Sequence, residues 1–298
     1  MQSTSSARQT AGIAFYLLGV FLFAANDALG KWLVVDFSVG ELLLVRSIGG
    51  VAILLVIARC TGHRLALNGQ WGLQAARILF LTGDTYSFYY ATRALPLADV
   101  MTFYMAAPLI VTALSGPILG EKVGPFRWGA VLIGFIGVLI ALAPTSAAFS
   151  PSALIALFGA TMFAFSLTIT RKLRNSHWLP LVMWQFVGAG IVGALSSSFA
   201  WVTPGTVDTL LMLVVGVVSA FCFVCITRAL ALAPTALLAP FQYSAIVWAG
   251  ILGWIVWHDV PTPRILAGNA IIIGSGLFVL YRERRKRVSV GDAIEPIP

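Results

Sequence analysis

The chain has 298 residues, of which 59% are hydrophobic and only 10% charged, and its formal net charge is +8. A soluble domain carries about 25% charged residues, so this composition, with a mean hydropathy of +0.93, excludes a soluble globular protein. Membrane-spanning helices need about 20 consecutive apolar residues, whereas membrane barrels alternate apolar and polar residues. The continuous apolar runs of this sequence predict an all-α integral membrane protein.

Ten apolar runs follow one another and predict ten transmembrane helices. Their approximate ranges are 11–31, 39–58, 74–93, 97–118, 125–143, 151–170, 179–200, 208–229, 236–257 and 264–281. The first run is interpreted as an uncleaved span, because its counterpart later in the chain is retained. No phosphate-binding G-x-x-x-x-G-K-[ST] sequence lies between the runs, so we expect no ATP hydrolysis by this chain.

A short sequence motif occurs twice. The segment Thr92–Ala98 (TRALPLA) reappears as Thr227–Ala233 (TRALALA), and each copy is followed by an apolar run that ends near an acidic residue, Glu121 or Asp259. Further matches lie upstream at a constant spacing, among them Lys31 with Arg171. The chain therefore looks like a duplication.

The duplication predicts the domain organisation. Two repeats of five runs each cover 11–143 and 150–281, and a basic cytoplasmic tail covers 282–298. Because five is odd, the second repeat must enter the membrane from the side opposite to the first, which is an inverted repeat. Three prolines, Pro108, Pro117 and Pro240, lie within the runs and are expected to kink or loosen their helices.

Basic residues indicate the orientation. If the first run leaves the cytoplasm, most of the 19 Lys and Arg residues lie at cytoplasmic ends, and only Lys31, Arg93 and Arg264 lie on the other side. The positive-inside rule then places both termini in the cytoplasm. The positive charge is explained by topology and anionic lipid, so we expect the bilayer, and not nucleic acid, as a partner.

The three cysteines indicate no metal site. Cys222 and Cys225 form a C-x-x-C sequence within the eighth run, but no second pair and no nearby histidine completes a zinc site. Packing is the expected role of both, and no metal or cofactor is predicted.

Ionisable residues within the runs are the first candidates for function, because a charge at the bilayer centre costs about 2.5–3.5 kcal/mol on insertion scales. Asp84, Arg46 and Asp27 lie within runs, with Asn26 beside Asp27 and Lys31 one turn after it. One interpretation is structural: Asp27 neutralises Lys31 and Arg46 pairs with Asp84. The other is that these groups line a pathway, with Asp27 and Asp84 as candidate proton-coupling residues.

Aromatic and amide residues form a second candidate group within the runs. The selected members are Tyr86, Tyr104, Trp184, Gln242, Tyr243 and Trp248. Such side chains commonly pack or face lipid, but together with the charged residues they are what a mostly apolar pocket with a few polar groups requires. The predicted ligand is a small amphipathic organic solute.

Several of these residues also carry a family resemblance. Tyr89-Tyr90-Ala91 with Ala94-Leu95 and Ala98, then Pro108-Leu109, Leu119-Gly120-Glu121 and the glycines Gly129, Gly134 and Gly137 resemble the EamA domain of the drug/metabolite transporter superfamily. The second repeat resembles the partner domain, although it has His258-Asp259 where the family usually has Gly-Glu. The resemblance implies ten spans in two inverted halves around a central cavity and alternating access.

The sequence therefore predicts a secondary transporter of the bacterial inner membrane that exports aromatic or other hydrophobic amino acids. Asp84, Arg46 and Asn26 would contact the charged ends of the solute, and the aromatic group its side chain. The alternative is uptake of a vitamin or nucleoside-like metabolite such as riboflavin or S-adenosylmethionine. An enzyme is not expected, because His63, His177 and His258 all lie at run ends. A monomer is compatible with the sequence, and a dimer is not excluded.

Overall fold

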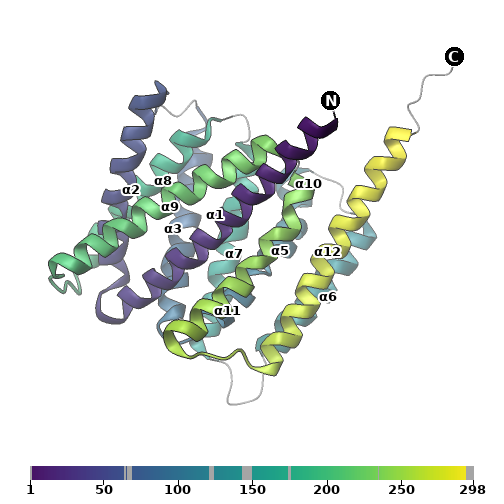
Figure 1. The fold of residues 1–298 in the computed structure, drawn as a ribbon. Coiled ribbons are helices and arrows are strands. Elements are labelled where there is room, and N and C mark those ends of the chain that lie inside the picture. Colours follow the sequence, from purple (N-terminus) through teal and green to yellow (C-terminus); the bar gives the residue numbers. More distant parts are fainter. Residues whose placement is uncertain are drawn as a thin grey trace.

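The computed structural model describes residues 2–63, 65, 69–120, 124–142, 150–173, 176–233 and 235–292. These residues form helices and short connections, without a strand among them (Figure 1). The helices of the first part are α1 (Gln2–Asp36), α2 (Val39–Thr61), α3 (Trp71–Thr92), α4 (Leu97–Tyr104), α5 (Ala107–Leu119) and α6 (Pro125–Leu142). Those of the second are α7 (Pro151–Lys172), α8 (Trp178–Ser197), α9 (Thr206–Leu232), α10 (Thr235–Leu238), the 3₁₀ turn η1 (Ala239–Tyr243), α11 (Ser244–Trp257) and α12 (Pro263–Asp292). The predicted all-α class is confirmed.

Six helical segments within these ranges are long and apolar enough to cross a membrane. They are Arg8–Asp36, Val39–Thr61, Leu97–Leu119, Pro151–Lys172, Trp178–Ser197 and Thr206–Leu232. Shorter apolar helices cover Trp128–Ala141, Phe241–Trp257 and Pro263–Phe278. The remaining predicted run lies on α3, which is less apolar because it carries buried Gln74, Arg77 and Asp84. The count of ten spans stays a prediction.

Two of the predicted runs are interrupted helices. The fourth run is divided into α4 and α5 at Met105–Ala106, just before Pro108 in the first turn of α5. The ninth run passes from α10 through η1, which contains Pro240, into α11. Proline removes one backbone donor and clashes with the preceding turn, so each break lies where the sequence predicts one.

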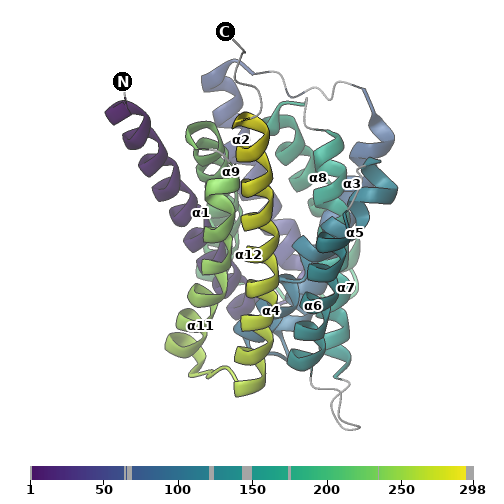
Figure 2. The ribbon, with the colours of Figure 1, turned by 90° about the vertical axis from the view of Figure 1, so that its right-hand side faces the viewer.

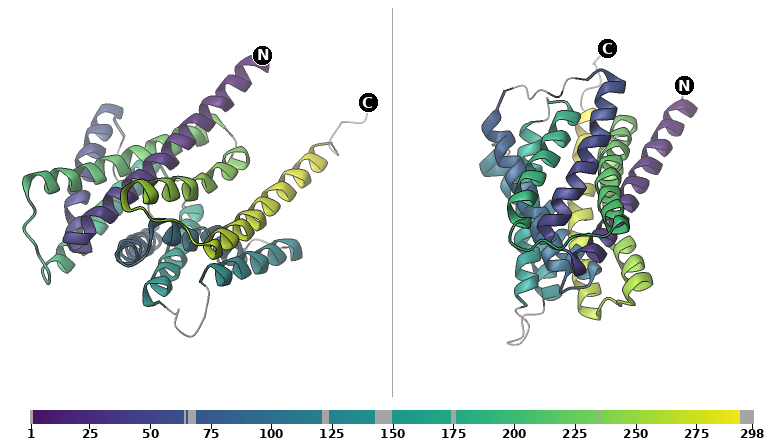
Figure 3. Two further views of the ribbon diagram at one scale, coloured as in Figure 1. Left: turned by 60° about the horizontal axis from the view of Figure 1, so that its bottom comes forward. Right: turned by 90° about the vertical axis from the view of Figure 1, so that its left-hand side faces the viewer.

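The most extensive helix contacts join the first part of the chain to the second. Helix α1 packs on α9, α2 on α8 and α9, α3 on α7, and α6 on α12. Close approach depends on small residues: a Cβ atom at Gly216 of α9 would meet the carbonyl oxygen of Arg46 on α2. Figures 1 and 3 show α2, α8 and α9 at one edge of the bundle and the α6–α12 pair at the opposite edge. The two sequence halves are thus interleaved.

The bundle has two distinct ends. The beginning of α1 and the end of α12 lie at the same end, here called the proximal end (Figure 2). The connection between α11 and α12 lies at the other, distal end. Large apolar side chains such as Leu79, Leu195 and Trp254 point outward and are more than half exposed, as expected for a surface that faces lipid.

Candidate substrate-binding site

Arg46 is the centre of a polar cluster between α2, α3 and α9. Its Nη1 donates to the hydroxyl of Tyr89 at 3.2 Å, and its Nη2 donates to Oγ of Ser219 at 3.4 Å. The guanidinium also lies over the rings of Tyr89 and Phe186, 5.7 and 5.9 Å from their centres. All of these partners are neutral, so the guanidinium is held in place with its charge uncompensated by direct contact.

The predicted structural bridge between Arg46 and Asp84 does not form. Within the described part of the chain, the sole ion pair joins Lys31 to Asp259. Asp27 and Asp84 nevertheless lie close enough to interact electrostatically with Arg46 and with each other. One guanidinium is therefore shared at longer range by two carboxyl groups.

One side-chain oxygen of Asp84, and one of Asn26 on α1, has no hydrogen-bond partner within the described part of the chain. Asp84 is 8% exposed and Asn26 is 3% exposed, and Oδ1 of each is buried without a donor. Leaving a buried polar group unpaired costs about 1–3 kcal/mol, more when it is charged. An unpaired buried group in a native protein requires an explanation. One explanation is a binding site in which a polar ligand supplies the missing hydrogen-bond partner.

Tyr104 closes one side of the cluster. Its hydroxyl donates to the backbone carbonyl of Asp84 at 3.2 Å, and its ring packs edge-on to Phe88 at 5.3 Å. Gly159 of α7 makes room for it, because a Cβ there would lie 2.3 Å from the Tyr104 hydroxyl. Tyr86, half-buried on the same helix as Asp84, packs against the same core.

The other predicted site residues lie elsewhere. Trp184 is 37% exposed, and its indole N–H donates at 3.2 Å to the carbonyl of Leu65, in the connection after α2. Tyr243 and half-buried Gln242 lie in η1, with the Tyr243 hydroxyl against Gly276 of α12. Trp248 of α11 packs edge-on to Phe21 of α1 at 5.0 Å. No contact joins these residues to Arg46 or Asp84 among the interactions of the described residues.

Three residues that contact Arg46 were not selected from the sequence as site residues: Tyr89, Phe186 and Ser219. Tyr89 and Phe186 belong to the aromatic residues within the runs, and Ser219 was not singled out. Ser219 is 2% exposed and is a rare hydroxyl in the long apolar run of α9, which is the signal that could have identified it.

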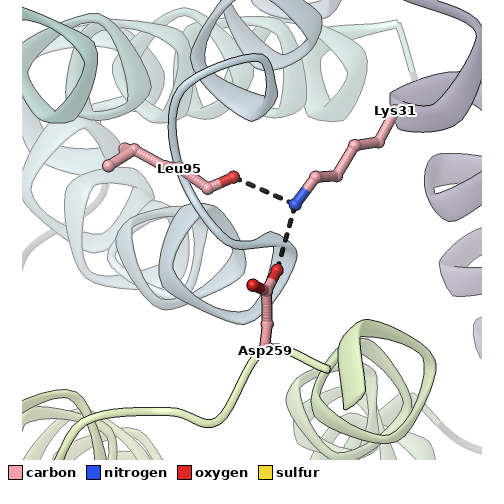
Figure 4. A network of polar contacts seen from close by, with 3 residues as sticks. All are labelled: Lys31, Leu95 and Asp259. Carbon is pink, nitrogen blue, oxygen red and sulfur yellow. Dashed lines mark hydrogen bonds and ion pairs between the residues drawn. The ribbon is translucent and has the colours of Figure 1, made fainter. Parts of the chain in front are cut away.

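A second polar cluster lies at the distal end (Figure 4). Nζ of Lys31 donates to Oδ2 of Asp259 at 3.3 Å and to the carbonyl of Leu95 at 3.2 Å. It also lies 4.5 Å from the ring centre of Trp257. The predicted neutralisation of Lys31 by Asp27 is thus wrong: a carboxylate 228 residues away in sequence takes that place.

Comparison with known proteins identifies the relatives of this chain. The model of the EamA-like transporter family matches residues 10–143 and again 150–281. An S-adenosylmethionine uptake transporter of Rickettsia prowazekii is 24% identical, covering 93% of this chain and 95% of its own length. A pseudopaline exporter of Pseudomonas aeruginosa is 27% identical, covering 88% of this chain and 93% of its own length. A riboflavin transporter of Vibrio cholerae is 28% identical, covering 92% of this chain and 94% of its own length.

A solved crystal structure shares the fold. It superposes with a TM-score of 0.66 at 18% sequence identity, over 94% of this chain and 97% of its own. Among the residues that the model describes, no three His, Cys, Asp or Glu side chains come together as metal ligands.

Proposed function

The chain belongs to the EamA-like transporter family, and from this premise we propose that it carries an amino acid or an amino-acid-bearing metabolite past the cluster around Arg46. The observation that carries the proposal is the composition of that cluster: among the described residues, the guanidinium has only neutral direct partners and lies near the carboxyl groups of buried Asp84 and half-buried Asp27. These are the charges that the carboxylate and ammonium ends of an α-amino acid require.

Each charged end of the solute has a candidate partner. Arg46 is suited to a carboxylate, because guanidinium binds carboxylate through two parallel hydrogen bonds. Asp84, with its unpaired Oδ1, is suited to the ammonium group, and Asn26 offers a further buried acceptor. The rings of Tyr104, Tyr86 and Phe186 would flank an apolar or aromatic side chain.

Export of aromatic or other hydrophobic amino acids from the bacterial cytoplasm is the first candidate activity. The second is uptake of a vitamin or nucleoside-like metabolite, and the relatives named for S-adenosylmethionine and riboflavin favour it. S-adenosylmethionine combines an α-amino acid end, a positive sulfur and an aromatic ring, so it also fits a site with more carboxylates than guanidinium groups. Protonation and deprotonation of Asp27 or Asp84 would couple either export or uptake of the solute to the proton gradient, which supplies the driving force.

Alternating access is the proposed mechanism, and the interrupted helices support it. Breaks in corresponding runs of two inverted repeats are typical of transporter sites near the bilayer midplane. A rocking of one sequence half against the other would disrupt all the extensive helix pairs, because each of these pairs joins the two halves. We therefore propose moving bodies that each contain helices of both repeats.

Counterflow into proteoliposomes tests the proposal. Vesicles preloaded with unlabelled compound are given radiolabelled phenylalanine, S-adenosylmethionine or riboflavin, and we expect uptake of one amino-acid-bearing compound above empty vesicles. Asp84→Asn and Arg46→Lys should each reduce the initial rate by about 10- to 100-fold, the value of one or two charged hydrogen bonds. Lysine is a poor substitute because it lacks the planar fork.

Matched controls are available on the surface. Asp36 and Arg59 are exposed, so Asp36→Asn and Arg59→Lys should leave the rate unchanged. Exchange of riboflavin alone would refute the amino-acid class, and equal losses in control and site variants would refute the assigned site.

A further inference from the structure

The Lys31 cluster connects three separate segments at the distal end. Lys31 comes from α1, the Leu95 carbonyl from the connection between α3 and α4, and Asp259 from the connection between α11 and α12 (Figure 4). The side chain of Lys31 is 9% exposed and that of Asp259 is 28% exposed. A buried ammonium therefore joins α11 to the neighbouring helices.

Among the described residues, other polar contacts hold one side of this junction. Arg93, next to the Leu95 segment, donates to the carbonyls of Val34 at 2.7 Å and Phe37 at 2.5 Å at the end of α1. Helix α1 and the α3–α4 connection thus remain joined without Lys31. Apart from its pair with Lys31, the contact given for Asp259 is to its own helix: His258 ends α11 with φ at 57°, and the Asp259 N–H donates to the carbonyl of Gly253 at 3.2 Å.

Helix α11 is connected to the rest of the chain through a natural pivot. Its N-terminal side continues directly into η1, where Pro240 interrupts the helical ladder. Helix-terminal residues of this kind absorb the backbone rotation of hinge movements. A swing of α11 about η1 would carry Asp259 away from Lys31 while leaving the Arg93 contacts intact.

A second carboxylate lies near Lys31. Asp99 of α4 interacts electrostatically with both Lys31 and Asp259, and its buried Oδ1 has no partner. Asp99 belongs to the same body as Arg93 and Leu95, not to α11. It is therefore placed to accept the ammonium when Asp259 departs, so that the buried charge is not left unpaired, which would cost several kcal/mol.

We propose that the Lys31–Asp259 pair is a latch that closes the distal mouth of the bundle, and that opening transfers the Lys31 ammonium to Asp99 as α11 swings outward. The inference rests on the proposed transport function, because it supplies the distal gate for alternating access. The test of the latch needs no substrate, so its result does not depend on which solute the protein carries.

Accessibility of the Arg46 cluster from each side of the membrane provides that test. The reporter is Ser219→Cys, which is nearly isosteric and lies beside a guanidinium that promotes thiolate reactivity, in a chain whose native Cys60, Cys222 and Cys225 are replaced by alanine. A membrane-impermeant methanethiosulfonate is added to oriented vesicles from either side. Complete labelling after denaturation serves as the reference for each variant.

A latch that stabilises only the closed form raises the ratio of closed to open molecules, by a factor set by the free energy that the latch contributes. Removing the latch lowers that ratio by the same factor. Lys31→Met and Asp259→Asn should therefore each label at least about ten-fold faster from the distal side, with no change from the proximal side. Lys172→Met, at an exposed lysine near the proximal end of α7, is the matched control and should label at the parent rate. Equal rates in Lys31→Met and Lys172→Met would overturn the proposal.

Two further variants separate a latch from loss of packing. The exchange Lys31→Asp with Asp259→Lys should restore slow distal labelling, because the pair is rebuilt with its charges reversed. Asp99→Asn should label more slowly than the parent, because the ammonium loses its partner in the open form. Fast labelling of the exchanged variant, or faster labelling of Asp99→Asn, would overturn the latch or the role of Asp99, respectively.

Discussion

Ser219 shows how a single hydroxyl positions the charged group of the site. Its Oγ donates to the carbonyl of Val215 at 2.8 Å, one turn earlier in α9, and accepts from Nη2 of Arg46. The hydroxyl hydrogen is thus occupied, and the oxygen presents its free lone pair to the guanidinium. The hydroxyl of Tyr89 accepts a hydrogen bond from the other terminal nitrogen of the guanidinium. Arg46 is therefore oriented by neutral groups and not by a directly bound carboxylate.

Ser219→Ala should therefore weaken transport without abolishing it. A hydrogen bond to a charged group contributes about 1.5–3 kcal/mol, and this one is long, at 3.4 Å, which places it at or below the lower end of that range. We therefore expect a rise in KM of about 2- to 10-fold in the counterflow assay, with the maximal rate nearly unchanged. Ser198→Ala is the matched control, because Ser198 is exposed and makes the same bond to the carbonyl four residues earlier, at 3.0 Å. An unaltered KM in Ser219→Ala would show that Arg46 does not depend on this contact.

The residues of the site could be predicted only in part from the sequence. Asp84, Arg46, Asp27 and Tyr104 are recognisable because polar groups are costly within apolar runs, and the structure brings them near one another. The partner of Lys31 was missed because the helical i to i+4 rule considers only local neighbours, whereas Asp259 is brought in by the packing of α11 beside α1. Trp184 contacts the Leu65 carbonyl instead of the residues around Arg46, a difference that the sequence does not show because an apolar run gives no depth for each of its residues.

At the scale of elements, the contact between α2 and α9 depends on glycines, and Gly216 makes the tightest approach. A Cβ at Gly216 would lie 1.8 Å from the carbonyl oxygen of Arg46 and 2.7 Å from the nitrogen of Gly50. Both neighbours are backbone atoms in helices and cannot move aside as a side chain can. The two helices must separate to admit even a methyl group, and Arg46 would move with them.

Gly216→Ala is accordingly expected to destabilise the protein by about 1–3 kcal/mol, as overpacking does, and to lower the melting temperature in detergent. Gly250→Ala is the control: it lies in α11 with no atom within 4 Å of the added Cβ, so it should gain up to about 1 kcal/mol of helix propensity. A melting temperature of Gly216→Ala at or above that of Gly250→Ala would contradict the close packing of α2 on α9.

Helix positions were more predictable than helix contacts. Every predicted run lies on helix, including α3 despite its buried arginine and aspartate, because run length and turn residues are local properties. The breaks before α5 and α11 follow from Pro108 and Pro240 in the same way. Which helix lies beside which is set by side-chain packing between distant segments, and no periodicity encodes it.

For the whole molecule, interleaving predicts that neither half is stable alone. Residues 1–146 contain α1, α2, α3 and α6, whose most extensive partners, α9, α8, α7 and α12, all lie in 147–298. Each fragment expressed by itself should be degraded or aggregate, and the two together should restore a complex that co-purifies in detergent. Fluorescence size-exclusion chromatography of tagged fragments measures this directly.

A monodisperse fragment 1–146 that melts cooperatively by itself would contradict this expectation. The matched control is a full-length chain with a protease site between residues 146 and 147. Cleavage of the folded protein at this site should leave counterflow intact, because the two halves have already assembled. Loss of the complex after that cut would show that the connection, and not the helix contacts, holds the halves together.

The pairing of α1 with α9 also determines when the protein can acquire its native form during synthesis. Helix α1 leaves the ribosome long before its main neighbour has been made. Its packed face, which carries buried Asn26 and half-buried Asp27, must therefore wait in the translocation machinery or among lipids for a segment still to be translated. Insertion of the early helices and assembly of the bundle are thus separated in time, and agents that delay elongation between them would expose the nascent chain to membrane proteases.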